Sequence, residues 1–196
     1  SFDNAGGQIG TGRGALTLAS NGAFSNENGQ IIAAGGPLVL TAGRIAGSAG
    51  SLLQSSDAIT LTAGQISNDN STILARSGDI TLAGAGNSAT ALSNVNGGVI
   101  QASGAISATF SALDNSGGAV SALGGDLSLN GASGSSVTNA GGTLETANNL
   151  TLTAGSYSGA GASRLTAGQA MTLSLSGSME NGGNIAAVHN VSVTAA

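Results

Sequence analysis

Few side chains in this sequence could carry out chemistry. The 196 residues include nine acids, four arginines, one histidine (His189) and no cysteine. Carboxylates that hydrolyse glycosides act in pairs about 5 to 9.5 Å apart, and zinc sites draw mainly on His and Cys. Catalysis would therefore require a fold that gathers scattered acids. His189 has no second His or Cys with which to bind zinc, so we predict no metal and no cofactor.

The elements that would position these residues come from a short repeat. Residues 113–129 (LDNSGGAVSALGGDLSL) show an apolar residue, an Asn two places later, a Gly pair, a second apolar residue, another Gly pair and an apolar–polar–apolar ending. Nine copies follow one another at steps of 20 to 26 residues, which is typical of a solenoid. The first apolar anchors are Phe2, Phe24, Ile45, Ile66, Leu92, Leu113, Val137, Tyr157 and Met179.

Each copy contains two further apolar sites. Apolar and polar residues alternate over three to five positions, which predicts β-strands, and no stretch keeps the helical period. The expected second anchors are Ile9, Ile31, Leu52, Ile73, Val99, Val120, Leu144, Leu165 and Ile185. The expected third strands carry Leu16/Leu18, Leu38/Leu40, Ile59/Leu61, Ile80/Leu82, Ile106/Ala108, Leu127/Leu129, Leu150/Leu152, Met171/Leu173 and Val191/Val193.

Three strands of this length cannot enclose a core alone, but stacked copies can. Parallel pairing of each strand with its counterpart in the next copy predicts an all-β fold. The expected architecture is a right-handed parallel β-helix of nine coils with three short strands per coil, in one domain over residues 1–196. The copies differ in length mostly after the third strand, so residues 84–91 and 130–136 are expected to be loops.

Composition and charge exclude several function classes. A net charge of −5 with only four basic residues leaves no basic stripe for phosphates, so nucleic acid is not an expected partner. No apolar run approaches the roughly 18 residues of a membrane span. The first residues lack the basic and apolar regions of a signal peptide, so any export signal is expected outside this stretch.

An Asn recurs two residues after the first anchor in seven copies, and Gly47 and Gly159 take its place in the other two. Both residue types tolerate positive φ, and the Asn amide can also bond to turn backbone and to the next Asn in a stack. We expect a structural ladder, because seven equivalent copies are more than a ligand site needs. This Asn ladder consists of Asn4, Asn26, Asn68, Asn94, Asn115, Asn139 and Asn181.

Parallel β-helices also serve as polysaccharide-degrading enzymes, which gives an alternative function. On the repeat register, Glu27 shares a column with Asp69, and Asp79 shares another with Asp126, each pair two coils and about 9.6 Å apart. That separation is near the upper limit for an inverting pair, but no Arg, Lys or His lies at the matching position between the acids. We expect the acids to be solvated turn residues and predict no catalytic residue.

A second alternative rests on Thr and Ser at outward positions of the third strands. Arrays of Thr-x-Thr on stacked coils resemble the surface of β-solenoid ice-binding proteins. Thr is also ordinary at exposed strand positions, and Ala19, Val39, Ala83 and Asn130 interrupt the array. The outward pairs are Thr60/Thr62, Ser107/Thr109, Thr151/Thr153, Thr172/Ser174 and Ser192/Thr194.

A strip of aliphatic side chains is predicted on the outside of the second strands. If each second anchor points inward, its neighbour points outward, and in four successive copies an Ile or Leu would take that outward place. Stacked at about 4.8 Å, four such side chains would form a patch for lateral contact. The alternative is a local bulge or a covering loop that buries them. The strip consists of Ile32, Leu53, Leu74 and Ile100.

Three segments resemble the repeats of filamentous haemagglutinins, the large exoproteins of two-partner secretion in Gram-negative bacteria. They are residues 24–43 (FSNENGQIIAAGGPLVLTAG), 113–129 and 137–155 (VTNAGGTLETANNLTLTAG). The resemblance covers nearly the whole chain. Its specificity comes from nine registered copies, with departures at residues 44–54 and 157–165, where Gly replaces Asn.

The resemblance implies a β-helical shaft that is exported through an outer-membrane transporter and displayed at the cell surface. Adhesins and contact-dependent growth inhibition effectors share such repeats, so a receptor or glycan on a host or neighbouring cell is an expected partner. The secretion domain of the family is not visible in these residues, so we expect an internal piece of a longer rod. Bare strand edges would then favour end-to-end or lateral self-association.

Overall fold

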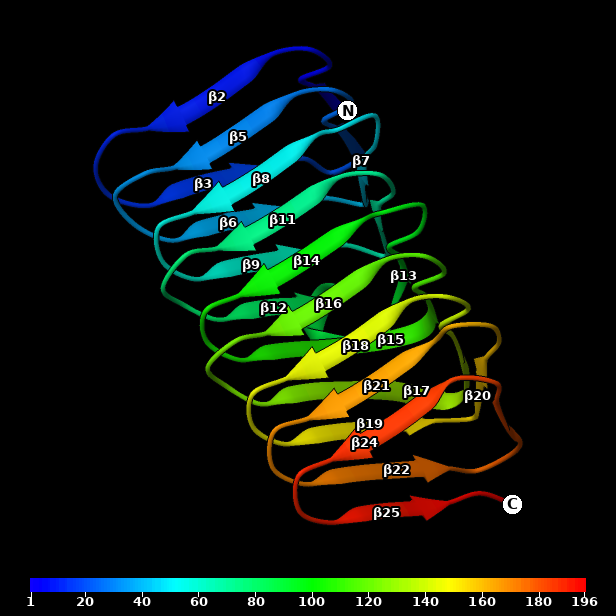
Figure 1. The fold of residues 1–196 in the computed structure, drawn as a ribbon. Helices are drawn as coiled ribbons and strands as arrows, with labels where there is room; N and C mark the ends of the chain where they lie inside the picture. The colour runs from blue at the N-terminus through cyan, green and yellow to red at the C-terminus, as the bar shows by residue number, and fades with distance from the viewer.

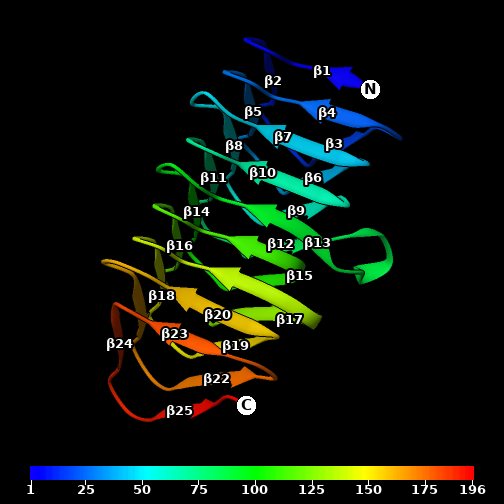
Figure 2. The same cartoon turned by 90° about the vertical axis from the view of Figure 1, so that its right-hand side faces the viewer.

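The chain winds into a right-handed parallel β-helix of nine coils. A computed structural model describes all residues 1–196, with 25 strands and a single 3-10 turn. In Figure 1 the strands of the front face run to the left, the chain returns to the right along the face behind them, and each coil lies below the previous one. Seen from its N-terminal end, the chain therefore turns clockwise as it moves away from the viewer, which makes the helix right-handed. Figure 2 shows the third side of the prism.

The coils begin at the nine predicted first anchors, so coil 3 spans residues 45–65 and coil 8 spans residues 157–178. The first strands are β1 (Phe2–Asp3), β4 (Ala23–Ser25), β7 (Arg44–Gly47), β10 (Gln65–Asn68), β13 (Thr90–Ser93), β20 (Ser156–Gly159), β23 (Met179–Asn181) and the last parts of β15 (Ile106–Asp114) and β17 (Leu127–Thr138). These strands form the first-strand face.

The other two faces are equally regular. The second-strand face is a nine-stranded parallel sheet of β2 (Gln8–Thr11), β5 (Gln30–Ala33), β8 (Leu52–Ser55), β11 (Thr72–Ala75), β14 (Val99–Ala102), β16 (Ala119–Ala122), β18 (Thr143–Thr146), β21 (Arg164–Ala167) and β24 (Asn184–Ala187). The third-strand face consists of β3 (Leu16–Ala19), β6 (Leu38–Thr41), β9 (Ile59–Thr62), β12 (Ile80–Ala83), the first parts of β15 and β17, β19 (Leu150–Ala154), β22 (Met171–Leu175) and β25 (Val191–Thr194).

Like side chains stack on like along the rod, as the sequence predicts for the first and third strands. Phe2 pairs with Phe24, and Phe24 with Ile45, and the two Phe rings stack 4.8 Å apart. That distance equals the spacing of hydrogen-bonded strands. Most of the anchors lie in one continuous core of 39 buried residues, whereas Phe2, Val191 and Val193 in the end coils are exposed. Fully burying an aliphatic side chain contributes about 1.5–3 kcal/mol, so stacking stabilises coils that could not bury their anchors alone.

Two corners of the prism differ in construction. The Asn corner joins each first strand to the second strand of the same coil and contains the predicted Asn positions. The loop corner joins each third strand to the first strand of the next coil. At the loop corner after β12, residues 84–89 project outward and include the 3-10 turn η1 (Ala85–Asn87). No helix in the structure is long and apolar enough to cross a membrane.

The second predicted loop is instead part of a strand. β17 runs through the loop corner without a break, although its register against β15 shifts there. Phe110 pairs with Gly131 and Ala112 with Ser136, so four residues of β17 lie opposite Ser111 alone. Residues 132–134 are exposed on the outside of this bulge, whereas Ser135 is buried. Phe110 is fully buried and fills the corner behind the bulge. The ring supplies apolar volume that allows the chain to widen here without leaving a void.

Candidate functional site

The Asn side chains of the Asn corner point into the rod and bond to one another. In coils 4 to 7 they form one chain: Asn68 Nδ2 donates to Asn94 Oδ1, Asn94 Nδ2 to Asn115 Oδ1, and Asn115 Nδ2 to Asn139 Oδ1, each over 2.7 Å. All four residues are buried. An amide can do this in every coil because it carries both a donor and an acceptor.

The remaining predicted members of the Asn ladder behave in two ways. Asn4 Nδ2 donates to Asn26 Oδ1 over 2.7 Å, so coils 1 and 2 are linked like coils 4 to 7. Asn181 is exposed, and its Nδ2 donates only to the carbonyl oxygen of Gly183 in its own turn, over 3.3 Å. The structure therefore brings six of the seven Asn residues into the interior in two separate groups.

Each buried amide also holds backbone. Asn115 Nδ2 lies 3.3 Å from the Gly118 oxygen of its own turn and 3.1 Å from the Thr143 oxygen of the next coil. Gly118 has no room for a side chain, because a Cβ there would overlap the carbonyl oxygen of Asn94. All six buried amides donate within the protein, and four of them also accept there, so the ladder serves to hold the corner together.

Gly47 and Gly159 interrupt the ladder, and different residues fill the space. A Cβ on Gly47 would lie 2.7 Å from the hydroxyl oxygen of Ser51, which is buried at the Asn corner. Beside Gly159 lie two larger polar groups: the Ser163 hydroxyl donates to the Gly159 oxygen over 3.0 Å, and the Tyr157 hydroxyl accepts from Asn139 Nδ2 over 3.4 Å. Gaps in the ladder are therefore filled with hydroxyl groups.

Tyr157 is the one group whose pKa is clearly displaced. Burial raises the pKa of its hydroxyl above the usual 10, and hydrogen bonds with Asn139 and Ser163 partly oppose that rise. A raised folded-state pKa means that the native protein holds the phenol proton more tightly than the unfolded chain. This contribution to stability is complete below pH 10 and is lost as the pH rises through the folded-state pKa.

The acids of the first predicted column have structural contacts or face water. Asp69 Oδ1 accepts hydrogen bonds from the Ser93 hydroxyl at 2.6 Å and from the Val95 amide at 3.2 Å, and Oδ2 accepts one from the Ser67 hydroxyl at 2.8 Å. Glu27 is exposed at the Asn corner. Asp69 thus ties coil 4 to coil 5, as a turn residue does.

The acids of the second column bond to the next coil. Asp79 Oδ1 accepts from the Ala105 amide at 2.7 Å, and Asp126 Oδ1 accepts from the Asn149 amide at 3.0 Å. No three His, Cys, Asp or Glu side chains gather into a group that could hold a metal ion, and His189 is exposed. The structure does not bring the acids together into a site.

Hydroxyl side chains form a regular array on the third-strand face. Successive strands are in register, so the outward residues of β9, β12, β15, β17, β19, β22 and β25 form an unbroken column of hydroxyls. Val39 ends this column at Thr60. In the second column of outward residues, which contains Thr62 and Thr153, Asn130 replaces a hydroxyl residue and Ala83 is buried. The unbroken column is Thr60, Thr81, Ser107, Ser128, Thr151, Thr172 and Ser192.

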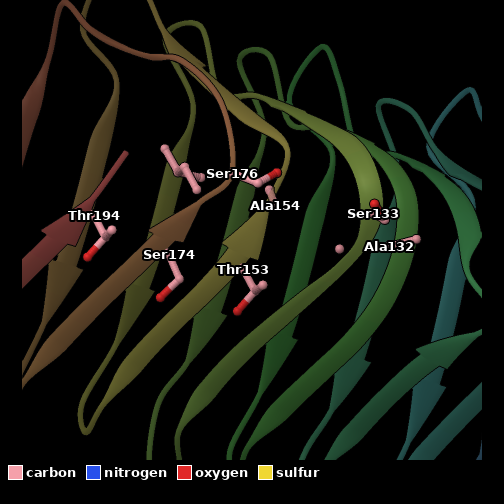
Figure 3. A pocket seen from close by; sticks show the side chains of 9 residues that line it. Ala132, Ser133, Thr153, Ala154, Ser174, Ser176 and Thr194 are labelled. Carbon is pink, nitrogen blue, oxygen red and sulfur yellow. The ribbon is translucent and has the colours of Figure 1, made fainter. Parts of the chain in front are cut away.

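A shallow hollow of about 460 Å³ lies where this face meets the bulge of β17. In Figure 3, Thr153, Ser174 and Thr194 stand in a row on successive strands, and Ala132 and Ser133 lie on the bulge to one side. None of its nine lining residues is charged. Its polar groups are single hydroxyls without an acid, base or metal ligand, so the hollow has no chemistry beyond hydrogen bonding.

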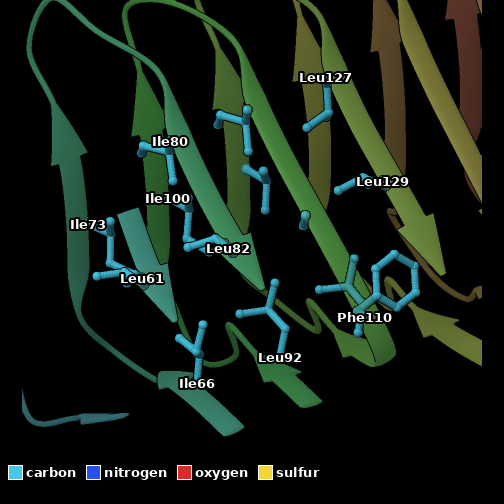
Figure 4. Close-up of a cluster of buried hydrophobic side chains, with 14 of the residues drawn as sticks. Leu61, Ile66, Ile73, Ile80, Leu82, Leu92, Ile100, Phe110, Leu127 and Leu129 are labelled. Atoms are coloured by element: carbon cyan, nitrogen blue, oxygen red, sulfur yellow. The ribbon is translucent and has the colours of Figure 1, made fainter. Parts of the chain in front are cut away.

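The predicted lateral strip is wrong at two of its four positions. Leu53 and Ile100 are buried, with 4% and 0% of their surfaces exposed, whereas Ile32 and Leu74 are half-buried on the outside. Figure 4 shows Ile100 among the core side chains, between Ile73 and Leu82. The four residues therefore do not form one strip.

The register differs from the predicted one in coils 3 and 5 because their turns at the Asn corner, like that of coil 8, contain an extra residue. Coil 3 has two successive residues with positive φ, Ala49 at 56° and Gly50 at 82°, and coil 5 has Asn96 at 56° and Gly97 at 84°. The extra residue moves the strand by one place, and a shift of one residue exchanges its inner and outer faces. Leu53 and Ile100 therefore become second anchors in place of Leu52 and Val99.

The sequence does contain a signal for this shift. In coils 5, 6 and 7 the buried anchor lies two residues after the second Gly of a Gly pair: Ile100 after Gly98, Val120 after Gly118, and Leu144 after Gly142. Counting from the Gly pair places Ile100 correctly, whereas counting seven residues from the first anchor does not.

The outward aliphatics of the second-strand face form a zigzag. They are half-buried and alternate between the two outward positions of successive strands. Gln54 and Gln101 take the places that the prediction gave to apolar residues. This outward set consists of Ile32, Leu52, Leu74 and Val99.

These features define the class of protein: a β-solenoid with a continuous apolar core and mostly uncharged faces that carry only shallow hollows. The family comparison agrees. A model of the haemagglutinin repeat family matches residues 1–28, 25–84, 81–131, 122–157 and 155–196, and the chain belongs to this family. Searches of curated proteins and of solved structures found no match. Fold and family together support a shaft of a haemagglutinin-like protein.

Proposed function

We propose that the chain is a shaft segment of a secreted, surface-displayed exoprotein of the filamentous haemagglutinin type. The observation that supports this best is the continuous register of nine coils around one core. Such a rod sets a distance and resists bending, and neither task needs a catalytic group. In this role the shaft presents a distal domain, adheres along its sides, or does both.

Export and location follow from the same proposal. A two-partner-secretion transporter of the outer membrane would carry the chain to the surface of a Gram-negative cell, where a receptor or glycan on another cell would be its contact. The absence of cysteine suits this route, because no disulfide can link the chain before it leaves the cell. The match to the haemagglutinin repeat family over the whole chain supports this setting.

Display at the surface can be tested on intact cells that make the full exoprotein. An antibody against residues 1–196 should label unpermeabilised cells, and added protease should remove the label. Inactivating the cognate transporter should abolish labelling while the protein remains detectable in lysed cells. Labelling that appears only after permeabilisation would contradict the proposal.

One observation favours a second candidate, ice binding by the third-strand face. The hydroxyl column from Thr60 to Ser192 keeps its register over seven coils, as a surface that orders water would require. Thermal hysteresis of the purified chain tests this directly. Activity that disappears in a Thr151→Lys, Thr172→Lys variant would support ice binding, and no activity in the unaltered chain would remove it.

A further inference from the structure

We propose that coil 3 is a yield point built into the rod, where a folded shaft opens first under force, heat or denaturant while the coils on both sides stay folded. The structure singles out this coil by a gap in the Asn ladder and by the conformation of its turn. The inference concerns the fold itself and does not depend on the role proposed above.

The first observation is the gap in the ladder. Asn26 in coil 2 and Asn68 in coil 4 both lie inside, but Gly47 between them has no side chain. Asn26 Nδ2 therefore donates only to carbonyl oxygens, those of Gly29 at 3.2 Å and Leu52 at 3.3 Å. Each neighbouring group of the ladder has amide–amide bonds of 2.7 Å, and coil 3 has none.

At Gly47 itself only backbone and hydroxyl donors of coil 4 take the place of an amide–amide bond, although the Gly50 amide of the same turn donates to the Asn70 oxygen over 2.8 Å. The Asp69 amide donates to the Gly47 oxygen over 3.2 Å, and the Ser67 hydroxyl donates to the same oxygen over 3.5 Å. Hydrogen bonds weaken as the distance grows beyond about 3.2 Å. The Gly47 oxygen thus receives one bond at the long end of the ordinary range and one weak bond, where coils 4 to 7 have a 2.7 Å bond between amides.

The second observation is the turn of coil 3. Ala49 adopts a φ of 56°, a left-handed conformation in which its Cβ is crowded by the following carbonyl oxygen. The equivalent turn of coil 5 has Asn96 there, a residue that tolerates this conformation well. Coil 3 therefore combines a strained turn with the gap in the ladder.

Coil 8 also has Gly in place of Asn, but a large side chain fills the space there. The ring of Tyr157 is buried, and its hydroxyl accepts the donor of Asn139. At coil 3 the side chains nearest to a Cβ on Gly47 are the small ones of Ser51 and Ser71. A large ring makes many packing contacts that a serine cannot, so coil 3 is the weaker of the two interruptions.

A stacked rod responds to such a gap locally. Each coil contacts only its neighbours, so the stability of the array is close to a sum of coil and interface contributions. The least stable interior unit then opens most often, and amide hydrogen exchange reports that opening. An opening at coil 3 would lengthen the rod by releasing about one coil of chain, while the flanking coils remain folded.

Hydrogen exchange on the 196-residue chain tests the proposal. We expect amides of β8 to exchange at least tenfold faster than those of β16, and faster than those of β5. The comparison with β5 matters because coil 2 is nearer the start of the chain, so fraying from that end would make β5 the faster strand. Exchange in β5 that equals or exceeds that in β8 would overturn the proposal.

A repair variant and its reverse separate the gap from other causes. Gly47→Asn with Ser51→Gly gives coil 3 the Asn and the Gly at the two ends of the Asn94 to Gly98 turn of coil 5 and leaves Ala49 unchanged, and it should slow exchange of β8 about tenfold. Asn115→Gly, which keeps Gly118 and so adds no clash with the Asn94 carbonyl oxygen, should open a new yield point and speed exchange of β16. If the repaired chain folds and β8 exchanges as before, or if the reverse variant leaves β16 unchanged, the gap does not set the yield point.

Discussion

The Asn corner and the loop corner carry the same chain around the same core, yet they differ in how they accommodate extra residues. At the Asn corner the side chains point inward, and one extra residue reverses the faces of the next strand in coils 3 and 5. At the loop corner the chain adds residues 84–89 or the bulge of β17, and the register shift is confined to the corner, so that the anchors on both sides still pair with those of the next coil.

The difference lies in what each corner must satisfy. Buried amides of the Asn corner have fixed partners in two coils, and a buried polar group without a partner costs about 1–3 kcal/mol. The loop corner sends its extra residues into water, where backbone groups are solvated. It still has one defect, because the buried hydroxyl of Thr90 has no hydrogen-bond partner. Variation in length therefore accumulates at the loop corner.

The largest expected effect comes from a methyl group at the Asn corner. In Gly118→Ala the new Cβ would overlap the Asn94 carbonyl oxygen, so the backbones of two coils would have to separate. We expect the free energy of unfolding to fall by about 4 kcal/mol or more in a urea titration. Gly86→Ala at the loop corner is the matched control, since nothing lies within 4 Å of its Cβ. The positive φ of this residue should lower the free energy of unfolding of Gly86→Ala by only about 1–2 kcal/mol. Equal losses in the two variants would contradict the proposed difference between the corners.

The corrected register gives the next effect. Leu53→Ala should lower the free energy of unfolding by about 2–5 kcal/mol, because it leaves a cavity in the core. Leu52→Ala removes a half-buried side chain from the outside and should cost about 1 kcal/mol or less. Thermal or urea denaturation of the two variants measures the difference. A larger loss for Leu52→Ala would restore the register that the spacing of anchors predicted.

A third test removes one link of the ladder. Asn115→Ala removes the donor to Asn139 Oδ1 and leaves Asn94 Nδ2 with only the Ala119 oxygen, and we expect a loss of about 1–3 kcal/mol in the free energy of unfolding. Asn181→Ala takes away an exposed amide and should change the same quantity by about 0.5 kcal/mol or less. Similar losses would mean that the buried amide bonds do not stabilise the rod.

The smallest effect is expected at the loop corner. Six Gly and Ser residues inserted between Gly86 and Asn87 would double the loop of residues 84–89, and doubling a loop costs about 0.6 kcal/mol. The same insertion after Gly117 should unfold the coil, because the amides there would lose their partners. Urea titration of both variants is sufficient, and a loss of several kcal/mol for the first would show that the loop corner is also constrained.

Much of the fold could be predicted because the repeat carries it nine times. First and third strands pair as the sequence indicates, and aligned anchors such as Leu113 and Val137 lie directly opposite each other. The fold class is confirmed, as is membership of the haemagglutinin repeat family. The loop expected at residues 130–136 is instead a bulge within β17.

The register of single strands could not be predicted by spacing alone. Leu52 and Leu53 are adjacent residues of the same type, so hydrophobicity cannot tell which points inward. The turn decides, through the positive φ of Ala49, and Ala gives no warning of that conformation. The Asn ladder was predictable in position, but its gap at coil 3 depends on how Ser51 and Ser71 fill the space around Gly47.

The central claim is that the molecule is a rod of interchangeable coils, and deleting whole coils tests it most directly. Removing residues 45–91 joins Arg44 to Leu92, which keeps the register and places Asn26 beside Asn94. Small-angle scattering should show a folded rod of unchanged cross-section that is shorter by about 9.6 Å, twice the spacing of paired strands. A chain that unfolds, or a particle whose cross-section grows, would contradict the account.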